Sequence, residues 1–199
     1  MKRIKNILKL TLCILVLNSC ADDVLNLEDP GAPTDATFFQ TAAQLEVALS
    51  GIYQTLNYVR VVPFPQLLDH TTDYAFNRGN VGGTVPATTG GLTSTEGIVV
   101  AHWNRFYTGV QRANNLLTNM DKAAEVTDKD RFDEIRGEAL FLRAMFYSYL
   151  TELFGDVPFR TDVATTLDNL SIPKSSLAEV VNAIIADLEE AATLLPPTQ

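Results

Sequence analysis

The chain has 199 residues, with 24 acidic and 15 basic side chains and a formal net charge of −9. Four basic residues and no acidic residue lie in the first 19 positions, so residues 20–199 carry 11 basic and 24 acidic side chains, a net charge of −13. Such an acidic chain repels nucleic acid and anionic lipid surfaces, and its length suffices for one domain with a buried core.

The N-terminal segment has the three-part layout of a secretory signal peptide. A basic stretch comes first, an apolar run covers residues 10–17, and the tetrapeptide Leu17-Asn18-Ser19-Cys20 follows. This tetrapeptide resembles a lipobox, in which the chain is cut before the Cys and the thiol is lipidated. The apolar run is too short to span a bilayer, which needs about 20 residues. We therefore expect residues 1–19 to be removed and Cys20 to anchor the protein to a membrane; an ordinary secretory signal with an incidental Cys is the alternative.

Residues 20–40 are predicted to form a polar tether and entry segment, because Pro30, Gly31 and Pro33 favour an extended chain. The acidic pair Asp22-Asp23 resembles the tag that directs some lipoproteins of Gram-negative bacteria to the outer cell surface; a solvated acidic linker is an equal alternative. With Cys13 in the signal segment and Cys20 lipidated, no thiol remains for a disulfide, a zinc site or a nucleophile.

Four amphipathic helices are predicted after the tether. The first begins at the capping box Thr41–Gln44 and continues for about four turns, and the second covers about 95–120. The third covers about 130–154, with Gly155 placed to end it, and the fourth runs from the capping box Ser176–Glu179 to just before Pro196. Gly137 within the third helix predicts a close helix crossing.

The apolar stripes of these helices are predicted to be buried. They comprise Leu45, Ala48, Leu49, Ile52 and Leu56 in the first helix; Val99, Trp103, Phe106, Val110, Ala113, Leu117 and Met120 in the second; Ile135, Ala139, Leu142, Phe146, Tyr149 and Leu153 in the third; and Leu177, Val181, Ile184, Leu188 and Leu195 in the fourth. The predicted fold class is all-α, a tetratricopeptide-like helical scaffold with long irregular loops at 58–93 and 156–174. A loop as long as the first is more often functional than idle.

No catalytic or metal-binding group of residues emerges from the sequence. His70 and His102 lack the spacing of metal ligands and are predicted to be loop or cap residues. Arg136, Glu138 and Arg143 lie on or beside the buried face of the third helix, where each charge needs a partner, so we expect ion pairs or interhelical hydrogen bonds there. The chain is expected to bind rather than catalyse, with no metal and no cofactor.

Several segments resemble the SusD/RagB family. The stretch Arg136-Gly-Glu-Ala-Leu-Phe-Leu-Arg-Ala-Met-Phe-Tyr-Ser-Tyr-Leu, followed by Leu153-Phe-Gly-Asp-Val-Pro158, is similar to the signature helix of that family. The segments from Phe38 to Tyr53, from Trp103 to Leu117 and from Ser175 to Pro196 are similar to its other helices. The resemblance covers essentially the whole chain.

The resemblance implies a surface-exposed lipoprotein of the outer membrane that captures oligosaccharides and hands them to a SusC-like TonB-dependent barrel. A peptide-binding RagB-like relative, and a lid that docks on the transporter without binding a ligand, remain alternatives. Members of this family are not enzymes, and the acidic charge argues against a nucleic-acid partner. They are usually much longer, so residues 41–199 are expected to be an incomplete N-terminal SusD-like domain, truncated at the C-terminus.

A carbohydrate site needs aromatic platforms flanked by hydrogen-bonding side chains, because sugar rings present apolar C–H faces and a rim of hydroxyls. The segment after the first helix supplies these types, and the candidate ligand-binding residues are Tyr58, Arg60, Tyr74, Phe76, Asn77 and Arg78. Packing of these aromatic rings over the helical core is the alternative. Trp103 lies on the stripe of the second helix and is expected in the core.

Overall fold

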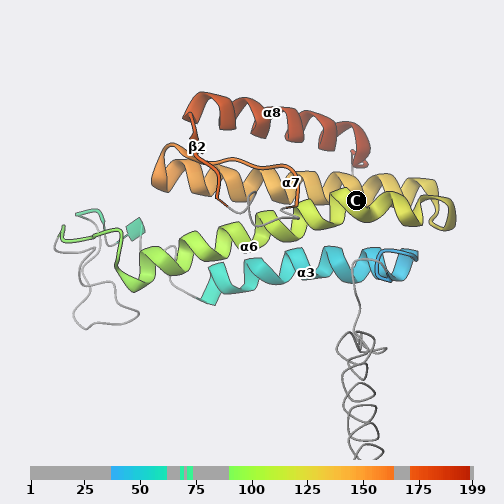
Figure 1. Cartoon of the computed structure of the whole chain (residues 1–199), viewed down its shortest axis with the longest axis horizontal. Helices are drawn as coiled ribbons and strands as arrows, with labels where there is room; N and C mark the ends of the chain where they lie inside the picture. Colours follow the sequence, from blue (N-terminus) through green and yellow to red (C-terminus); the bar gives the residue numbers. More distant parts are fainter. Residues whose placement is uncertain (1–36, 62–67, 70, 74–89, 164–170, 198–199) are drawn as a thin grey trace, which may run out of the picture. The chain divides into compact units, whose positions relative to one another are not determined.

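The computed structural model describes residues 37–61, 68–69, 71–73, 90–163 and 171–197. Figure 1 shows their elements, which in chain order are α3 (Ala42–Val61), α6 (Gly97–Asn119), the 3₁₀ helix η2 (Met120–Val126), α7 (Lys129–Phe154), the strands β1 (Val157–Pro158) and β2 (Lys174–Ser175), and α8 (Leu177–Leu194). The four predicted helices and the all-α class are therefore confirmed. None of the described helices is long and apolar enough to cross a membrane.

The helix ends are set by local hydrogen bonds, as their sequences predict. Before α3, the Thr41 amide donates to Gln44 Oε1 at 3.1 Å and the Gln44 amide donates to Thr41 Oγ1 at 3.3 Å, which is a complete capping box. At α8, Ser176 Oγ accepts from the Glu179 amide at 3.3 Å. Helix α7 ends at Gly155, whose φ of 70° lies in the left-handed region that glycine adopts without strain.

The helices pack in chain order. Helix α6 lies against α3, α7 lies against α6 and also contacts α3, and α8 lies on α7 (Figure 1). The core lies between α3, α6 and α7, where Leu45, Ile52, Phe106, Leu142 and Phe146 are almost completely buried. The antiparallel pair β1–β2 joins Val157 to Ser175, so the segment after α7 returns to the start of α8. Trp103 packs against this core, as predicted.

Two glycines mark the closest helix contacts. A Cβ atom on Gly109 of α6 would lie 2.4 Å from the ring of Phe146 on α7, so only glycine fits there. A Cβ atom on Gly137 of α7 would lie 2.9 Å from Leu195 Cγ, just beyond the end of α8. The close crossing predicted at Gly137 is therefore confirmed, and the closer approach at Gly109 adds a second.

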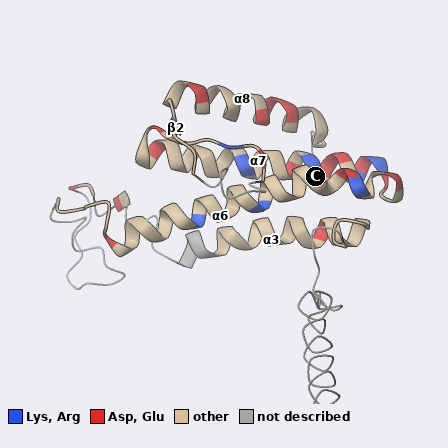
Figure 2. Cartoon of the chain, viewed as in Figure 1, with Lys and Arg blue, Asp and Glu red and all other residues tan. Residues whose placement is uncertain are grey.

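Charged groups join α3 to α7. The Arg131 guanidinium donates to both carboxylate oxygens of Glu46 at 2.6 and 2.8 Å, and to Glu134 and Glu138 at 2.8 and 3.1 Å. Tyr53 of α3 donates to the second oxygen of Glu138 at 2.7 Å. The hydrogen bond from Arg131 lowers the pKa of Glu46. The partners expected for Glu138 are thus present. Figure 2 shows acidic and basic residues close together along this end of α7.

Two sequence expectations are wrong. His102 is neither a loop nor a cap residue: it is buried within α6, and its Nδ1 lies 2.7 Å from the carbonyl oxygen of Ile98. The predicted buried stripe of the fourth helix is also wrong in part, because Leu177, Val181 and Leu188 are 45%, 37% and 39% exposed. Val180 and Ala191 are the buried residues of α8.

We expect Gly109→Ala to lower the free energy of unfolding by about 1–3 kcal/mol, because the added methyl group forces the Phe146 ring out of its place. Gly51→Ala is the matched control, since Gly51 also lies in a helix and nothing lies within 4 Å of a Cβ atom there. It is expected to raise stability by up to about 1 kcal/mol. Urea unfolding measures both, and equal stability of the two variants would contradict the close contact.

Candidate functional site

A cavity of about 410 Å³ lies where the chain between α3 and α6 meets the end of α7. Its lining is apolar with a few hydroxyl groups, and it consists of Leu68, Thr71, Leu92, Thr93, Ser94, Val99, His102, Leu153 and Phe154. Two parts of the predicted long loop, near residues 68–73 and 90–94, thus come together over the start of α6. A mainly apolar cavity of this size with a few polar groups is the usual form of a small-ligand site.

The predicted ligand-binding residues lie in two places along the chain: two belong to the end of α3, and four belong to the connection between α3 and α6. Tyr58 and Arg60 lie in the last turn of α3, with side chains outside the described part of the structure. Tyr74, Phe76, Asn77 and Arg78 lie outside the described residues, as does Cys20. Their place in a ligand site therefore stays a prediction.

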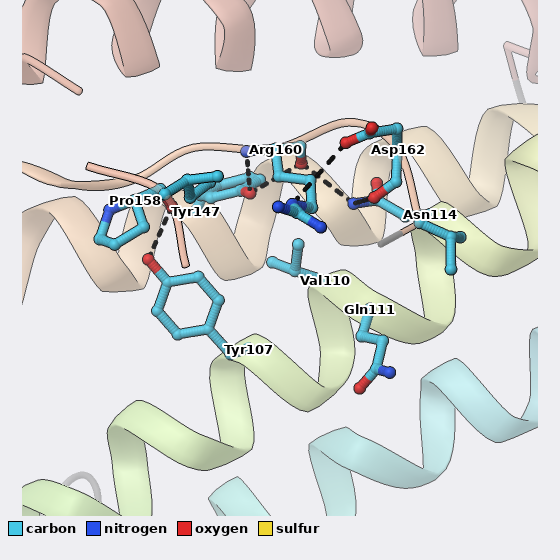
Figure 3. Close-up of a pocket in the computed structure, with 10 residues that line it drawn as sticks. Tyr107, Val110, Gln111, Asn114, Tyr147, Pro158, Arg160 and Asp162 are labelled. Carbon is cyan, nitrogen blue, oxygen red and sulfur yellow. Dashed lines mark hydrogen bonds and ion pairs between the residues drawn. The ribbon is translucent and has the colours of Figure 1, made fainter. Parts of the chain in front are cut away.

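A second cavity, of about 320 Å³, lies between α6 and the segment after α7 (Figure 3). It is lined by Tyr107, Val110, Gln111, Asn114, Tyr147, Pro158, Arg160, Asp162, Val163 and Ile172. Helix α6 supplies the floor with residues one turn apart, and the segment 158–163 supplies the roof. Figure 3 shows Tyr107, Tyr147 and Asn114 directed at the main chain of that roof.

The polar atoms of this second cavity hold the segment after α7 in place. The Tyr107 hydroxyl donates to the Pro158 carbonyl oxygen at 2.7 Å. The Tyr147 hydroxyl donates to the Arg160 carbonyl oxygen at 2.8 Å and accepts from the Arg160 amide at 2.9 Å. The Asn114 side-chain amide donates to the carbonyl oxygens of Arg160 and Asp162 at 3.0 and 3.3 Å. Burial raises the pKa of Tyr147 to about 12, so its hydroxyl stays protonated.

Asn114 is itself oriented by a buried ion pair. Arg143 Nη1 of α7 donates to Asn114 Oδ1 at 3.0 Å, which directs the amide nitrogen toward the segment 160–162. The same guanidinium donates to both carboxylate oxygens of Asp187 on α8, each at 2.7 Å. Only 8% of the Arg143 side chain and 15% of the Asp187 side chain are exposed. The interhelical partner predicted for Arg143 is therefore confirmed, and Arg136 likewise pairs with Glu190 at 2.7 Å.

The polar groups of the second cavity are suited to holding the segment after α7 in place rather than to proton transfer. The Tyr107 and Tyr147 hydroxyls and the Asn114 amide nitrogen bond to main-chain atoms. The Arg160–Asp162 ion pair at the rim measures 3.7 Å. Among the described residues, no three His, Cys, Asp or Glu side chains are placed to hold a metal ion. Sequence reasoning did not predict the roles of Asn114, Tyr107 and Tyr147; an Asn directly beside the stripe residue Ala113 is the one feature that could have indicated a buried polar contact.

We expect Asp187→Ala to lower the free energy of unfolding by about 3–5 kcal/mol, because it leaves the buried Arg143 charge without its carboxylate. Glu190→Ala is the matched control on the same helix, since it removes the more exposed pair with Arg136 and should cost at most about 1 kcal/mol. Chemical unfolding compares the two, and faster hydrogen exchange of the Arg160 amide in Asp187→Ala alone would report the loosened segment. A similar loss of unfolding free energy in both variants would contradict the inference that the buried Arg143–Asp187 pair contributes more than the exposed pair.

Comparison with known proteins identifies the family. Residues 26–199 match the model of a SusD-like family described as "starch-binding associating with outer membrane". The chain is 28% identical over 198 residues to SusD-like protein P2 of Formosa agariphila, an alignment that covers 96% of this chain and 38% of that protein. The 199 residues thus span well under half the length of this relative.

Solved structures agree in fold. A SusD-like protein from Bacteroides fragilis superposes with a TM-score of 0.72 at 22% identity, covering 83% of this chain and 32% of that one. A laminarin-binding SusD-like protein superposes with a TM-score of 0.69 at 23% identity, covering 79% and 35% of the two chains. At these identities the superpositions establish the shared helical scaffold, and together with the family match over residues 26–199 they show that the chain belongs to the SusD-like family.

Proposed function

We propose that the protein binds oligosaccharides at the outer membrane and delivers them to a SusC-like TonB-dependent transporter. The family match over residues 26–199, with its description as starch-binding and outer-membrane-associated, is the observation that carries the proposal. The superposition on a laminarin-binding protein supports a glycan as the ligand class. The protein acts by binding, without catalysis of its own.

We place the ligand contacts at the end of α3 and in the connection between α3 and α6. Tyr58, Tyr74 and Phe76 supply aromatic platforms for the apolar faces of sugar rings, and Arg60, Asn77 and Arg78 supply hydrogen bonds to hydroxyl groups. The cavity under Leu68, Leu92 and Thr93 supports this placement, because it lies where the described parts of the same connection converge. Arg60 and Arg78 also place positive charge in an otherwise acidic chain, next to the proposed ligand.

We expect Tyr74→Ala combined with Phe76→Ala to weaken glycan binding at least tenfold, equivalent to about 1.4 kcal/mol, because the stacking platforms are lost. The measurement is retardation of the full-length protein, purified from its membrane, in native gels that contain laminarin or starch. Phe141→Ala is the matched control: Phe141 is an aromatic residue of α7 with 45% exposure, away from the proposed site.

Three results would contradict parts of this proposal. Unchanged retardation of the double variant would remove the site assignment but leave glycan binding standing. Binding of peptides with no retardation by any glycan would favour the peptide-binding alternative. A folded protein that binds neither class would favour a lid that only docks on the transporter.

We further propose that lipid attached to Cys20 holds the protein at the outer membrane. The intact mass of the protein from outer-membrane fractions should equal that of a chain beginning at Cys20 plus acyl chains. Cys20→Ser should abolish the acyl mass and release the domain from the membrane fraction, because the thiol is the attachment point. Ser19→Ala is the matched control, since it keeps a small residue before the cut. A chain with residues 1–19 removed and no added mass would contradict the anchor.

A further inference from the structure

One basic side chain extends into the second cavity. Figure 3 shows Arg160 reaching from the roof toward Val110 on the floor. Only 18% of the Arg160 side chain is exposed, and its Nε lies 3.7 Å from Oδ1 of Asp162, whose side chain is 74% exposed. A guanidinium that faces a cavity from such a shielded position attracts a carboxylate more strongly than one in open water, because less water screens the charge.

Three hydrogen bonds hold the main chain of Arg160. The Tyr147 hydroxyl bonds to its carbonyl oxygen and to its amide, at 2.8 and 2.9 Å, and the Asn114 side chain donates to the same carbonyl oxygen at 3.0 Å. Tyr147 and Asn114 are each 1% exposed, and Arg143 orients Asn114. These buried groups fix the point from which the Arg160 side chain leaves the roof, which is the preorganisation that a binding residue needs.

A guanidinium can serve several acceptors at once, because it carries five N–H donors. Arg131 of the same chain does so, since it donates to the carboxylates of three glutamates at distances between 2.6 and 3.1 Å. The ion pair of Arg160 with Asp162 is therefore compatible with a second carboxylate inside the cavity. Asp162 would compete with that carboxylate for the guanidinium.

The walls around Arg160 suit the apolar face of a sugar ring. Val110, Pro158 and Ile172 contribute aliphatic carbon, and the ring of Tyr107 contributes an aromatic surface. At about 320 Å³ the cavity is near the lower end of the range for small-ligand sites, so it admits one sugar ring rather than a length of chain. A sugar that carries a carboxylate therefore matches both the walls and the guanidinium.

We propose that the second cavity binds a hexuronic acid residue, so that the protein captures acidic oligosaccharides. Arg160 binds the carboxylate, and the apolar walls contact the C–H face of the ring. This inference rests on the proposed function, because it takes the ligand to be a glycan. The second cavity shares no described lining residue with the cavity of about 410 Å³, so the two can be altered separately.

A peptide carboxylate fits this cavity less well than a uronate. The polar side chains Tyr107, Tyr147 and Asn114 bond to the main chain of the roof. A peptide that inserted an acidic side chain would bury main-chain N–H and C=O groups against apolar walls, where they lack partners. A sugar ring carries its hydroxyl groups on its rim, where they can turn toward water. The proposal therefore commits to a uronate.

The test compares an acidic ligand with its neutral counterpart. The full-length protein, purified from its membrane, is titrated calorimetrically with trigalacturonate and with trigalacturonate methyl ester, which has the same rings without the charges. We expect trigalacturonate to bind at least about tenfold more tightly than the ester, because charge-assisted hydrogen bonds form only with the carboxylate. With a net charge of −13 over residues 20–199, this part of the protein offers polyanions no general attraction that could imitate this result.

Three variants assign the preference to the cavity. Arg160→Gln should remove the preference, since the new side chain has no charge. Lys129→Gln is the matched control, because it removes a positive charge from a side chain of α7 that is 84% exposed, and it should leave the preference unchanged. Asp162→Asn should raise the affinity for trigalacturonate, because it removes the competing carboxylate from the rim. Circular dichroism and the unfolding midpoint verify that each variant is folded.

Equal binding of trigalacturonate and its ester, or a preference that persists in Arg160→Gln, would overturn the inference. If laminarin or starch still retards the protein in native gels, the proposed function stands without it; if no neutral or acidic glycan binds, both fail. A preference for triglutamate over trigalacturonate that depends on Arg160 would assign the cavity to peptide carboxylates and overturn the choice of a glycan. If Arg160→Gln does not fold, Asp162→Asn decides: an unchanged affinity for trigalacturonate contradicts the proposal, and a raised affinity supports it.

Discussion

Burial of the Arg143 guanidinium is the constraint on which this arrangement of helices depends. A charged group this far from water needs a carboxylate and further hydrogen-bond acceptors around it. Asp187 reaches it from α8 and Asn114 from α6, so the three helices have a mutual placement in which every polar atom of the cluster is used. Because Asn114 also holds the main chain at residues 160–162, the position of α8 is linked to that of a segment lying over α6.

The features that follow from neighbouring residues were predictable from the sequence. Helix starts at Thr41 and Ser176 and the helix end at Gly155 depend on bonds that reach no more than four residues. The contacts of the segment after α7 were not predictable, since Tyr107 and Pro158 are 51 residues apart and meet only once α6 and α7 have packed. Periodicity indicates which side chains are fit for burial, but not whether a neighbour covers them, which is why the exposure of Leu177, Val181 and Leu188 was missed.

For the candidate site, composition identified the connection after α3 as the ligand-binding segment, but it did not predict which residues of other elements would line the cavity. Prolines and glycines predicted the long connection after α3, and its aromatic and polar residues indicated a carbohydrate site. The walls contributed by Leu153 and Phe154, and the buried position of His102, follow from the crossing of α6 and α7 at that end of the array. A polar residue on a helix face, such as His102, has no single expected environment. Its Nδ1 can bond to a carbonyl oxygen one turn earlier inside the core, or to water outside it.

The packing of α3, α6, α7 and α8 in chain order has a consequence for how the protein folds. Each helix meets mainly the helices that precede it, so contacts form with little loop-closure entropy, and a chain that emerges N-terminus first can bury each helix soon after it appears. Arg143 is the exception, because its carboxylate comes 44 residues later in the chain. Until α8 is complete, that charge keeps α7 open to water. The arrival of α8 is therefore the step that closes the core, and a chain interrupted before Asp187 is expected to remain loosely packed.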